Sequence, residues 1–362
     1  MAKKINYNSD FMSRKQDEQL EQLEEKLTAL YANATNDIKA EFTDFMAAFS
    51  KQDEAKRLLV ETGNLSEDEY MAWRRTQILH STQYSKAVEA MTTMLVNTDV
   101  AAMALVNGEL PAVIAQSYDF IASLGFAAAD QAGITVGTFE IYNAETVQAL
   151  LRDNPDLMPA PRVNIPEDTK WNKDRINREI TQGIVKGESI PTVADRLAKV
   201  TTMDKNASIR NARTAMTSAE NLGRSQAADA LKEQGIPTEE VWSATYDDRT
   251  RETHLLLDGT VRDASGYFGV GIINTPLRYP ADPDGDPEEV YNCRCRLNIQ
   301  LQGIDHSQDG SLYEQFMREN YPDDWKALQE NEAQQARNIE IKEAKQRQAE
   351  ARSQQEEKKR RN

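Results

Sequence analysis

The chain has 362 residues, and its 59 acidic against 43 basic residues give a formal net charge of −16. This length exceeds that of a usual single domain, so two or three structural units are expected. The acidic balance argues against nucleic-acid binding over the whole surface, so any DNA contact would need a local basic segment. No apolar run of about 20 residues stands out, and we therefore expect no membrane segment.

The first 151 residues are predicted to form a helical region that makes assembly contacts. Between about Asp10 and Val60, apolar residues recur every three or four positions, which predicts one long amphipathic helix. This stripe consists of Leu20, Leu23, Leu27, Leu30, Ala34, Ile38, Phe42, Phe45 and Phe49. Its partner is either the rest of this chain or another chain, and its first part could form a short coiled coil.

A second helix is predicted to start at Ser66, which with Glu69 has the pattern of a capping box. Helical patterning then continues to about Asp130, interrupted by Asn107-Gly108 and Pro111. The stretch from Ile134 to Ile141 is a short candidate strand. Four prolines between residues 152 and 170 cannot all lie inside a helix, so this segment is predicted to be a linker.

Residues 171–302 are predicted to form the second unit. A helical lead-in covers 171–235, with separate helices at Thr192–Val200 and Lys205–Gln234. A small β-containing core covers 236–302, with short strands at Glu240–Thr245 and Thr260–Arg262. Apolar and polar residues alternate strictly from Cys293 to Gln302, which predicts a strand with both cysteines on its inner face.

The chain ends with a helical segment, residues 303–330, and a charged, Gln-rich tail, residues 331–362, which is either helical or disordered. Its basic run is a candidate contact with DNA or scaffold and consists of Lys358, Lys359, Arg360 and Arg361. The predicted fold class is α+β, predominantly helical at the N-terminus, with a small β-containing core near the C-terminus.

The only two cysteines, Cys293 and Cys295, are too few for a disulfide framework, and they favour a reducing compartment. On a strand their backbones would lie about 6.6 Å apart on one face, close enough to share an ion. Together with His254 they would supply three zinc ligands, with His306 or an aspartate as a fourth. The alternative is that both cysteines are small buried hydrophobic residues.

His254 also lies near carboxylates that could orient it as a general base, namely Asp247, Asp248 and Asp258. The sequence has no Gly-x-Ser-x-Gly nucleophile motif and no Gly-x-x-x-x-Gly-Lys phosphate loop. A structural interpretation is therefore favoured. In it, Asp248 caps a helix that starts near Thr250, while Arg249 and Arg251 pair with acidic residues in a buried network.

Several motifs together resemble the phage head morphogenesis family, the minor capsid proteins of the phage Mu protein F type. The resemblance covers roughly residues 165–302. It depends on Trp242, Asp248, Arg249, Thr250, Arg251, His254, Asp258, Gly259, Asn292, Cys293, Arg294 and Cys295. One departure is Ala215, which follows Thr214 where the family commonly has a glutamate.

The resemblance implies a non-enzymatic component of the virion or procapsid, made in the bacterial host cytoplasm. Such a protein would bind the phage portal vertex and assist procapsid assembly, DNA packaging or DNA ejection. Scaffold protein, major capsid protein and double-stranded DNA are further implied partners. The alternative function is a metal-dependent hydrolase or nuclease that uses His254 and the nearby aspartates.

Overall fold

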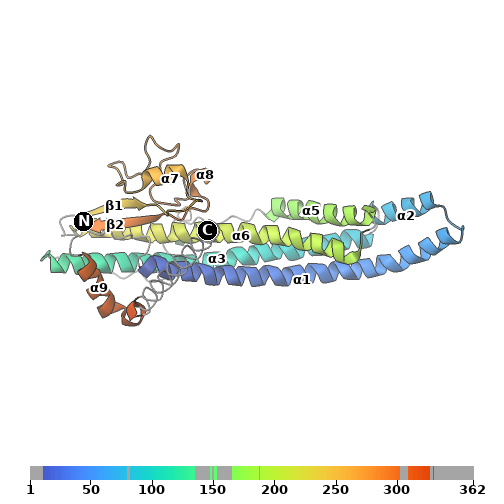
Figure 1. Cartoon of the computed structure of the whole chain (residues 1–362), viewed down its shortest axis with the longest axis horizontal. Coiled ribbons are helices and arrows are strands. Elements are labelled where there is room, and N and C mark those ends of the chain that lie inside the picture. The colour runs from blue at the N-terminus through green and yellow to red at the C-terminus, as the bar shows by residue number, and fades with distance from the viewer. Residues whose placement is uncertain are drawn as a thin grey trace, which may run out of the picture.

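The computed structural model describes residues 11–79, 82–134, 147–148, 151–152, 165–186, 188–301, 309–326 and 329. Within them the protein is an elongated helical bundle with a small sheet-and-loop layer on one end (Figure 1). This arrangement confirms the predominantly helical α+β class. The elements are α1 (Phe11–Glu61), α2 (Glu67–Leu79), α3 (Thr82–Gln131), α5 (Ile165–Lys186), α6 (Ile190–Glu233), β1 (Thr238–Ser243), α7 (Glu252–Leu257), α8 (Pro287–Val290), β2 (Arg296–Leu301) and α9 (Asp309–Asn320).

Three long helices, α1, α3 and α6, run side by side and form the bundle (Figure 1). The predicted apolar stripe of α1 is confirmed, and it is buried within this chain. Leu27 and Phe42 are fully buried in one core with Leu95 of α3 and Leu197 of α6. The partner of the amphipathic helix is therefore the chain's own bundle.

The capping box before α2 is confirmed by a reciprocal pair of hydrogen bonds. The Glu69 amide donates to Ser66 Oγ at 3.2 Å, and the Ser66 amide donates to Glu69 Oε2 at 3.0 Å. These bonds satisfy two amides that the first turn of a helix otherwise leaves unpaired.

Helix α3 is continuous through Pro111, so the predicted interruption at this point is wrong. On length and composition alone, Thr82–Asp130 could cross a membrane, since one 18-residue window has a mean hydropathy of 1.3. However, 61% of that window is buried in the protein. Packing against α1 and α6 accounts for the apolar composition, as expected of the core helix of a bundle.

Helix α6 runs unbroken where two helices were predicted, because Thr201 and Thr202 satisfy their hydroxyls inside it. Both hydroxyls donate to the carbonyl of Ala198, and Thr201 also contacts the Thr35 hydroxyl of α1. Helix α5 begins at Ile165, inside the predicted linker, because Pro166 stands in its first turn, where proline is tolerated.

The sheet is a single antiparallel pair in which Trp242 of β1 lies opposite Leu297 of β2. The predicted strand at Thr260–Arg262 is reduced to one bridge, between Val241 and Val261. Strand β2 starts at Arg296, so the prediction that both cysteines lie in it is wrong. Asn292 turns the chain just before them with a φ of 57°.

The candidate strand at Ile134–Ile141 lies largely outside the described residues, as does the segment after residue 329. One hydrophobic core contains residues from helices of the predicted N-terminal region together with residues of the β-containing part. The division of the chain into separate units stays a prediction.

Helices α3 and α6 lie in close contact at Gly223, where a Cβ atom would stand 2.4 Å from the Ile114 carbonyl oxygen. We expect Gly223→Ala to lower the free energy of unfolding by about 1–3 kcal/mol or more, because the backbones must move apart. Gly108→Ala on α3 is the matched control, since its Cβ would meet no atom within 4 Å. It should stabilise the protein by about 0.5–1 kcal/mol through helix propensity. Urea unfolding measures the free energy of unfolding of both variants. Equal changes in the two variants would contradict the close packing at Gly223.

Candidate functional site

Trp242 and His254 lie at the centre of the sheet-and-loop layer. Both are fully buried, and their rings meet edge to face with centroids 5.2 Å apart. The Gly259 amide donates to the Trp242 carbonyl, and the Trp242 amide donates to the Thr260 carbonyl. Gly259 has a φ of 75°, a conformation that favours glycine. This turn carries the chain from α7 back along β1 and places His254 behind the tryptophan.

Residues 247–251 connect the start of α7 to the chain before β2 through side-chain hydrogen bonds. Asp247 accepts hydrogen bonds from Arg294 and Thr250, and Arg251 donates to the Tyr291 carbonyl. The hydrogen bond from Arg294 holds the pKa of the Asp247 carboxyl well below its usual range. The contacts made by Arg294 and Arg251 join residues that lie 47 and 40 positions apart in the sequence.

Two structural predictions for this segment are wrong. Arg251 occupies the N-cap position of α7, so the exposed Asp248 does not cap that helix. Arg249 is exposed, near Asp247, and therefore belongs to no buried network. Asp258 instead accepts bonds from the Ala244 amide and the Tyr246 hydroxyl, which closes the loop around α7.

His254, Cys293 and Cys295 meet in one buried cluster. Their ligand atoms all lie within 4.8 Å of one another. His254 Nδ1 stands 3.7 Å from Cys293 Sγ and 3.4 Å from Cys295 Sγ. The hydrogen bond from Cys293, supported by His254, lowers the pKa of the Cys295 thiol, whereas the same hydrogen bond and burial raise the pKa of Cys293. On its other side, His254 Nε2 lies 3.1 Å from Glu289 Oε2 of α8.

Asn221 of α6 fixes the backbone on which the cysteines stand. Its side-chain amide donates to the carbonyls of Pro280 and Cys295, and its oxygen accepts from the Leu297 amide at 2.7 Å. The amide of Asn292 donates to Thr214 on the same helix. Helix α6 therefore positions the chain on both sides of Cys293.

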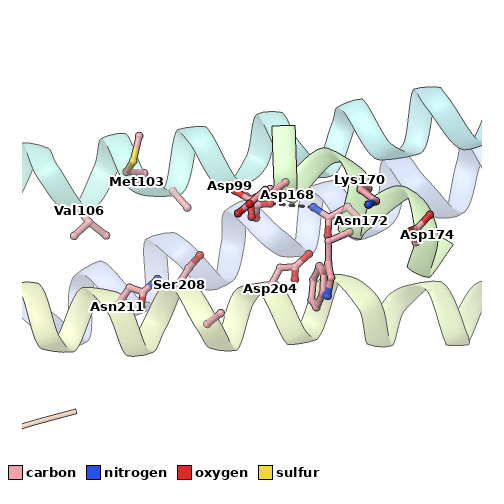
Figure 2. A pocket seen from close by; sticks show the side chains of 14 residues that line it. Asp99, Met103, Val106, Asp168, Lys170, Asn172, Asp174, Asp204, Ser208 and Asn211 are labelled. Atoms are coloured by element: carbon pink, nitrogen blue, oxygen red, sulfur yellow. Dashed lines mark hydrogen bonds between the residues drawn. The ribbon is translucent and has the colours of Figure 1, made fainter. Parts of the chain in front are cut away.

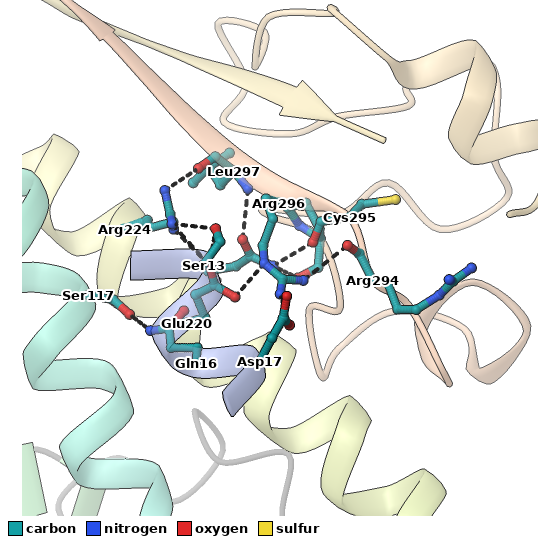
Figure 3. Close-up of polar contacts among 12 residues, drawn as sticks. Ser13, Gln16, Asp17, Ser117, Glu220, Arg224, Arg294, Cys295, Arg296 and Leu297 are labelled. Atoms are coloured by element: carbon teal, nitrogen blue, oxygen red, sulfur yellow. Dashed lines mark hydrogen bonds and ion pairs between the residues drawn. The ribbon is translucent and has the colours of Figure 1, made fainter. Parts of the chain in front are cut away.

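Figure 3 shows a second buried contact between α6, the start of α1 and β2. Glu220 lies 2.6 Å from Arg296 Nε and 3.0 Å from Arg224 Nη2, and Ser13 bridges Glu220 and Arg224. Arg296 also pairs with Asp17 at 2.8 Å. Because Arg296 and Asn298 are buried along with Leu297, the predicted alternation of buried and exposed residues along the strand does not hold.

Glu289, Glu220 and Arg224 were absent from the residues predicted to form the site. The sequence does mark Glu220 and Arg224, because they are charged residues in an alanine-rich helical stretch. Nothing in the sequence marks Glu289 above its neighbour Glu288. His306 and the basic run at 358–361 lie outside the described residues.

None of the three aspartates expected near His254 forms a hydrogen bond or ion pair with it among the described contacts. Asp247 binds Arg294, Asp258 binds Tyr246, and Asp248 is exposed. His254 is 1% exposed, and neither of the two described cavities is lined by it. A substrate therefore has no open route to this imidazole in the described part of the chain.

The larger of these cavities, about 640 Å³, lies between α3, α5 and α6 (Figure 2). Asp99 of α3 and Asp204 of α6 both face it and are mostly buried. Burial raises the pKa of Asp99 to about 6, and burial with the charge of Asp99 raises that of Asp204 to about 7. Among the described residues, Asp204 Oδ2 has no hydrogen-bond partner. Ionised carboxylates at this place oppose folding.

The pKa of Asp204 is higher in the folded than in the unfolded chain, so its contribution to stability is full below about pH 4 and is lost as the pH rises through about 7. We expect Asp204→Asn to raise the free energy of unfolding at pH 8 by on the order of 1 kcal/mol or more, and with it the melting temperature, because the amide carries no charge to bury. Near pH 4 the variant and the wild type should have the same melting temperature. Asp174→Asn, at the exposed rim of the cavity, should leave the pH dependence unchanged. A variant less stable than the wild type at pH 8 would contradict this account.

The amino-acid sequence was also compared with known proteins. Residues 174–298 match the family model described as phage Mu protein F like protein. The chain is 27% identical over 170 residues to the minor head protein GP7 of Bacillus phage SPP1. That alignment covers 46% of this chain and 52% of the relative, so the chain spans about half the length of the curated relative it matches. No solved structure matches the chain.

The family match includes the elements that build the site, from within α5 through α6 to the cysteine segment. Both matches agree with the resemblance inferred from the sequence motifs. Residues 174–298 are thus similar to phage Mu protein F, and the two matches together support a relation of this part of the chain to the phage head morphogenesis family.

Proposed function

We propose that the protein is a minor capsid protein of a tailed bacteriophage that docks on the portal vertex and assists head assembly. The observation that carries this proposal is the match of residues 174–298 to the phage Mu protein F-like model, supported by the similarity to a minor head protein. The virion or procapsid is its place of action. The chemistry of the site agrees, since His254 is buried and the contacts of Arg251 and Asp258 hold loops together.

The surface around α7 is the best candidate for the contact with the portal. Eight of the thirteen large apolar side chains exposed in the described residues lie between residues 246 and 291. They are Tyr246, Leu255, Leu256, Val261, Tyr267, Val270, Ile272 and Tyr291. We call this set the apolar loop surface. Exposed apolar side chains gathered in one segment are typical of protein-binding sites.

The N-terminal helices were the contact expected from the sequence. Their apolar stripe is buried inside the bundle, so it is not available to a partner. Outside the apolar loop surface, exposed large apolar residues are few; Leu58 and Leu59 form one pair, near the end of α1. This contrast favours docking through the Mu F-like domain.

The hydrolase or nuclease alternative lacks a comparable observation. The imidazole of His254 is buried, and the carboxylate beside it, Glu289, also accepts a hydrogen bond from Thr253. An acid–base site needs the catalytic group within reach of its substrate. We therefore give head assembly as the function.

The portal contact can be tested by co-purification with the portal protein of the same phage. The double variant Leu256→Glu with Val270→Glu should lose at least tenfold of the bound portal protein, because charges replace apolar contacts at the centre of an interface. Both side chains are more than half exposed, so the fold should be retained, as circular dichroism and thermal unfolding would check.

The matched control is Leu58→Glu with Leu59→Glu, which makes the same chemical change on α1. It should retain portal binding. Loss in the control with retention in the loop variant would move the contact to the N-terminal helices. A wild-type chain that does not bind the portal protein at all would contradict the proposed partner.

A further inference from the structure

The His254, Cys293 and Cys295 cluster has the dimensions of a metal site. Zinc lies about 2.3 Å from cysteine sulfur and about 2.0–2.1 Å from histidine nitrogen, so tetrahedral angles separate nitrogen and sulfur by about 3.6 Å. The two observed separations are 3.7 and 3.4 Å. We propose that these three side chains bind one Zn²⁺ ion.

Packing alone accounts poorly for this cluster. The Nδ1 atom of a neutral imidazole can accept only one short hydrogen bond, yet two sulfurs stand beside it. All three side chains are about 1% exposed, so water cannot serve the unmatched groups. A zinc ion satisfies the nitrogen and both sulfurs at once, and it neutralises the thiolates that would otherwise be buried charges.

The surroundings of the histidine support the same assignment. Metal-binding histidines commonly direct their second ring nitrogen to a carboxylate, which fixes the tautomer and the ring orientation. His254 Nε2 has no aligned hydrogen-bond acceptor and lies 3.1 Å from Glu289 Oε2. Thr253 donates to the same oxygen at 2.9 Å and holds the carboxylate in place. With the proton on Nε2, the lone pair of Nδ1 faces the two sulfurs.

The site would join two segments that little regular structure connects. His254 comes from the six-residue helix α7, and the cysteines precede β2, where Asn221 holds the Cys295 carbonyl. Within the described residues no further His, Cys, Asp or Glu joins the cluster, so the described chain supplies three of the usual four zinc ligands. The burial of the cluster fits a zinc ion that stabilises the fold.

The test uses the full-length chain, purified under reducing conditions, stripped of metal and titrated with zinc. We expect one zinc per chain by elemental analysis, and a chelator should lower the melting temperature. Cys293→Ser and Cys295→Ser should each abolish stoichiometric binding. Because a serine substitution at a buried position can also unfold the chain, cobalt is a second probe of the wild type. Tetrahedral cobalt bound to two thiolates gives intense visible bands and a thiolate-to-metal charge-transfer band.

Glu289→Gln and Glu288→Gln form a matched pair on α8. The first should weaken zinc binding by about 10–100-fold, as is usual when the carboxylate behind a histidine ligand is changed. The second alters an exposed neighbour and should leave affinity unchanged. Wild-type protein that binds no zinc, or binding that survives either serine substitution undiminished, would overturn the proposal. Portal binding is measured separately, so its failure would not affect this result.

Discussion

The contact between α6 and β2 holds the sheet-and-loop layer on the bundle. Its centre is Glu220, a fully buried carboxylate placed between Arg224 on its own helix and Arg296 on the strand. Removing one partner of such a buried pair typically costs about 3–5 kcal/mol, because the other charge is left without compensation. Ser13 of α1 joins the same network, so three parts of the chain meet at one charged group. A displacement of β2 would break several of these bonds together.

Because Asn221 follows Glu220 directly, the same turn of α6 also sets the position of the cysteine segment. Its three bonds to main-chain groups of Pro280, Cys295 and Leu297 leave the backbone before β2 little freedom. The cysteine segment is therefore held directly by a helix of the bundle. A fragment that began near Trp171 would expose the apolar face that α6 buries against α1 and α3.

Features governed by neighbours in the sequence were predictable. The periodic stripe of α1 and the capping box at Ser66 depend on residues three or four positions apart, and both are present. The predicted break near Thr201 fails because this residue finds its second partner, Thr35, 166 positions away. The strand from Cys293 fails for a similar reason. Burial of Arg296 depends on Glu220 and Asp17, which no local pattern reveals.

For the candidate site, the motif residues were found but their contacts were not. His254 was expected beside aspartates because these stand close to it in the sequence. The fold instead brings Glu289 to it, since α8 packs beside α7. Sequence proximity is a weak guide in this segment because its turns point successive polar side chains in different directions. Cys293 and Cys295 were paired correctly because a spacing of two keeps them together in the turn as well as in a strand.

The apolar loop surface and the buried cluster belong to the same stretch of chain. Between Ser243 and Arg296 only two helices of six and four residues occur, so regular hydrogen bonding fixes little of it. A loop segment that exposes apolar side chains needs other restraints, or those side chains would collapse onto the core. Here the Asp247–Arg294 and Asp258–Tyr246 pairs restrain the loops on either side of α7. The buried cluster of His254 and the two cysteines lies under this surface. A zinc ion at that point would hold α7 from below while its outer face stays free for a partner. This division explains why polar motif residues and exposed apolar ones alternate through one segment: the first set the shape of the surface that the second present.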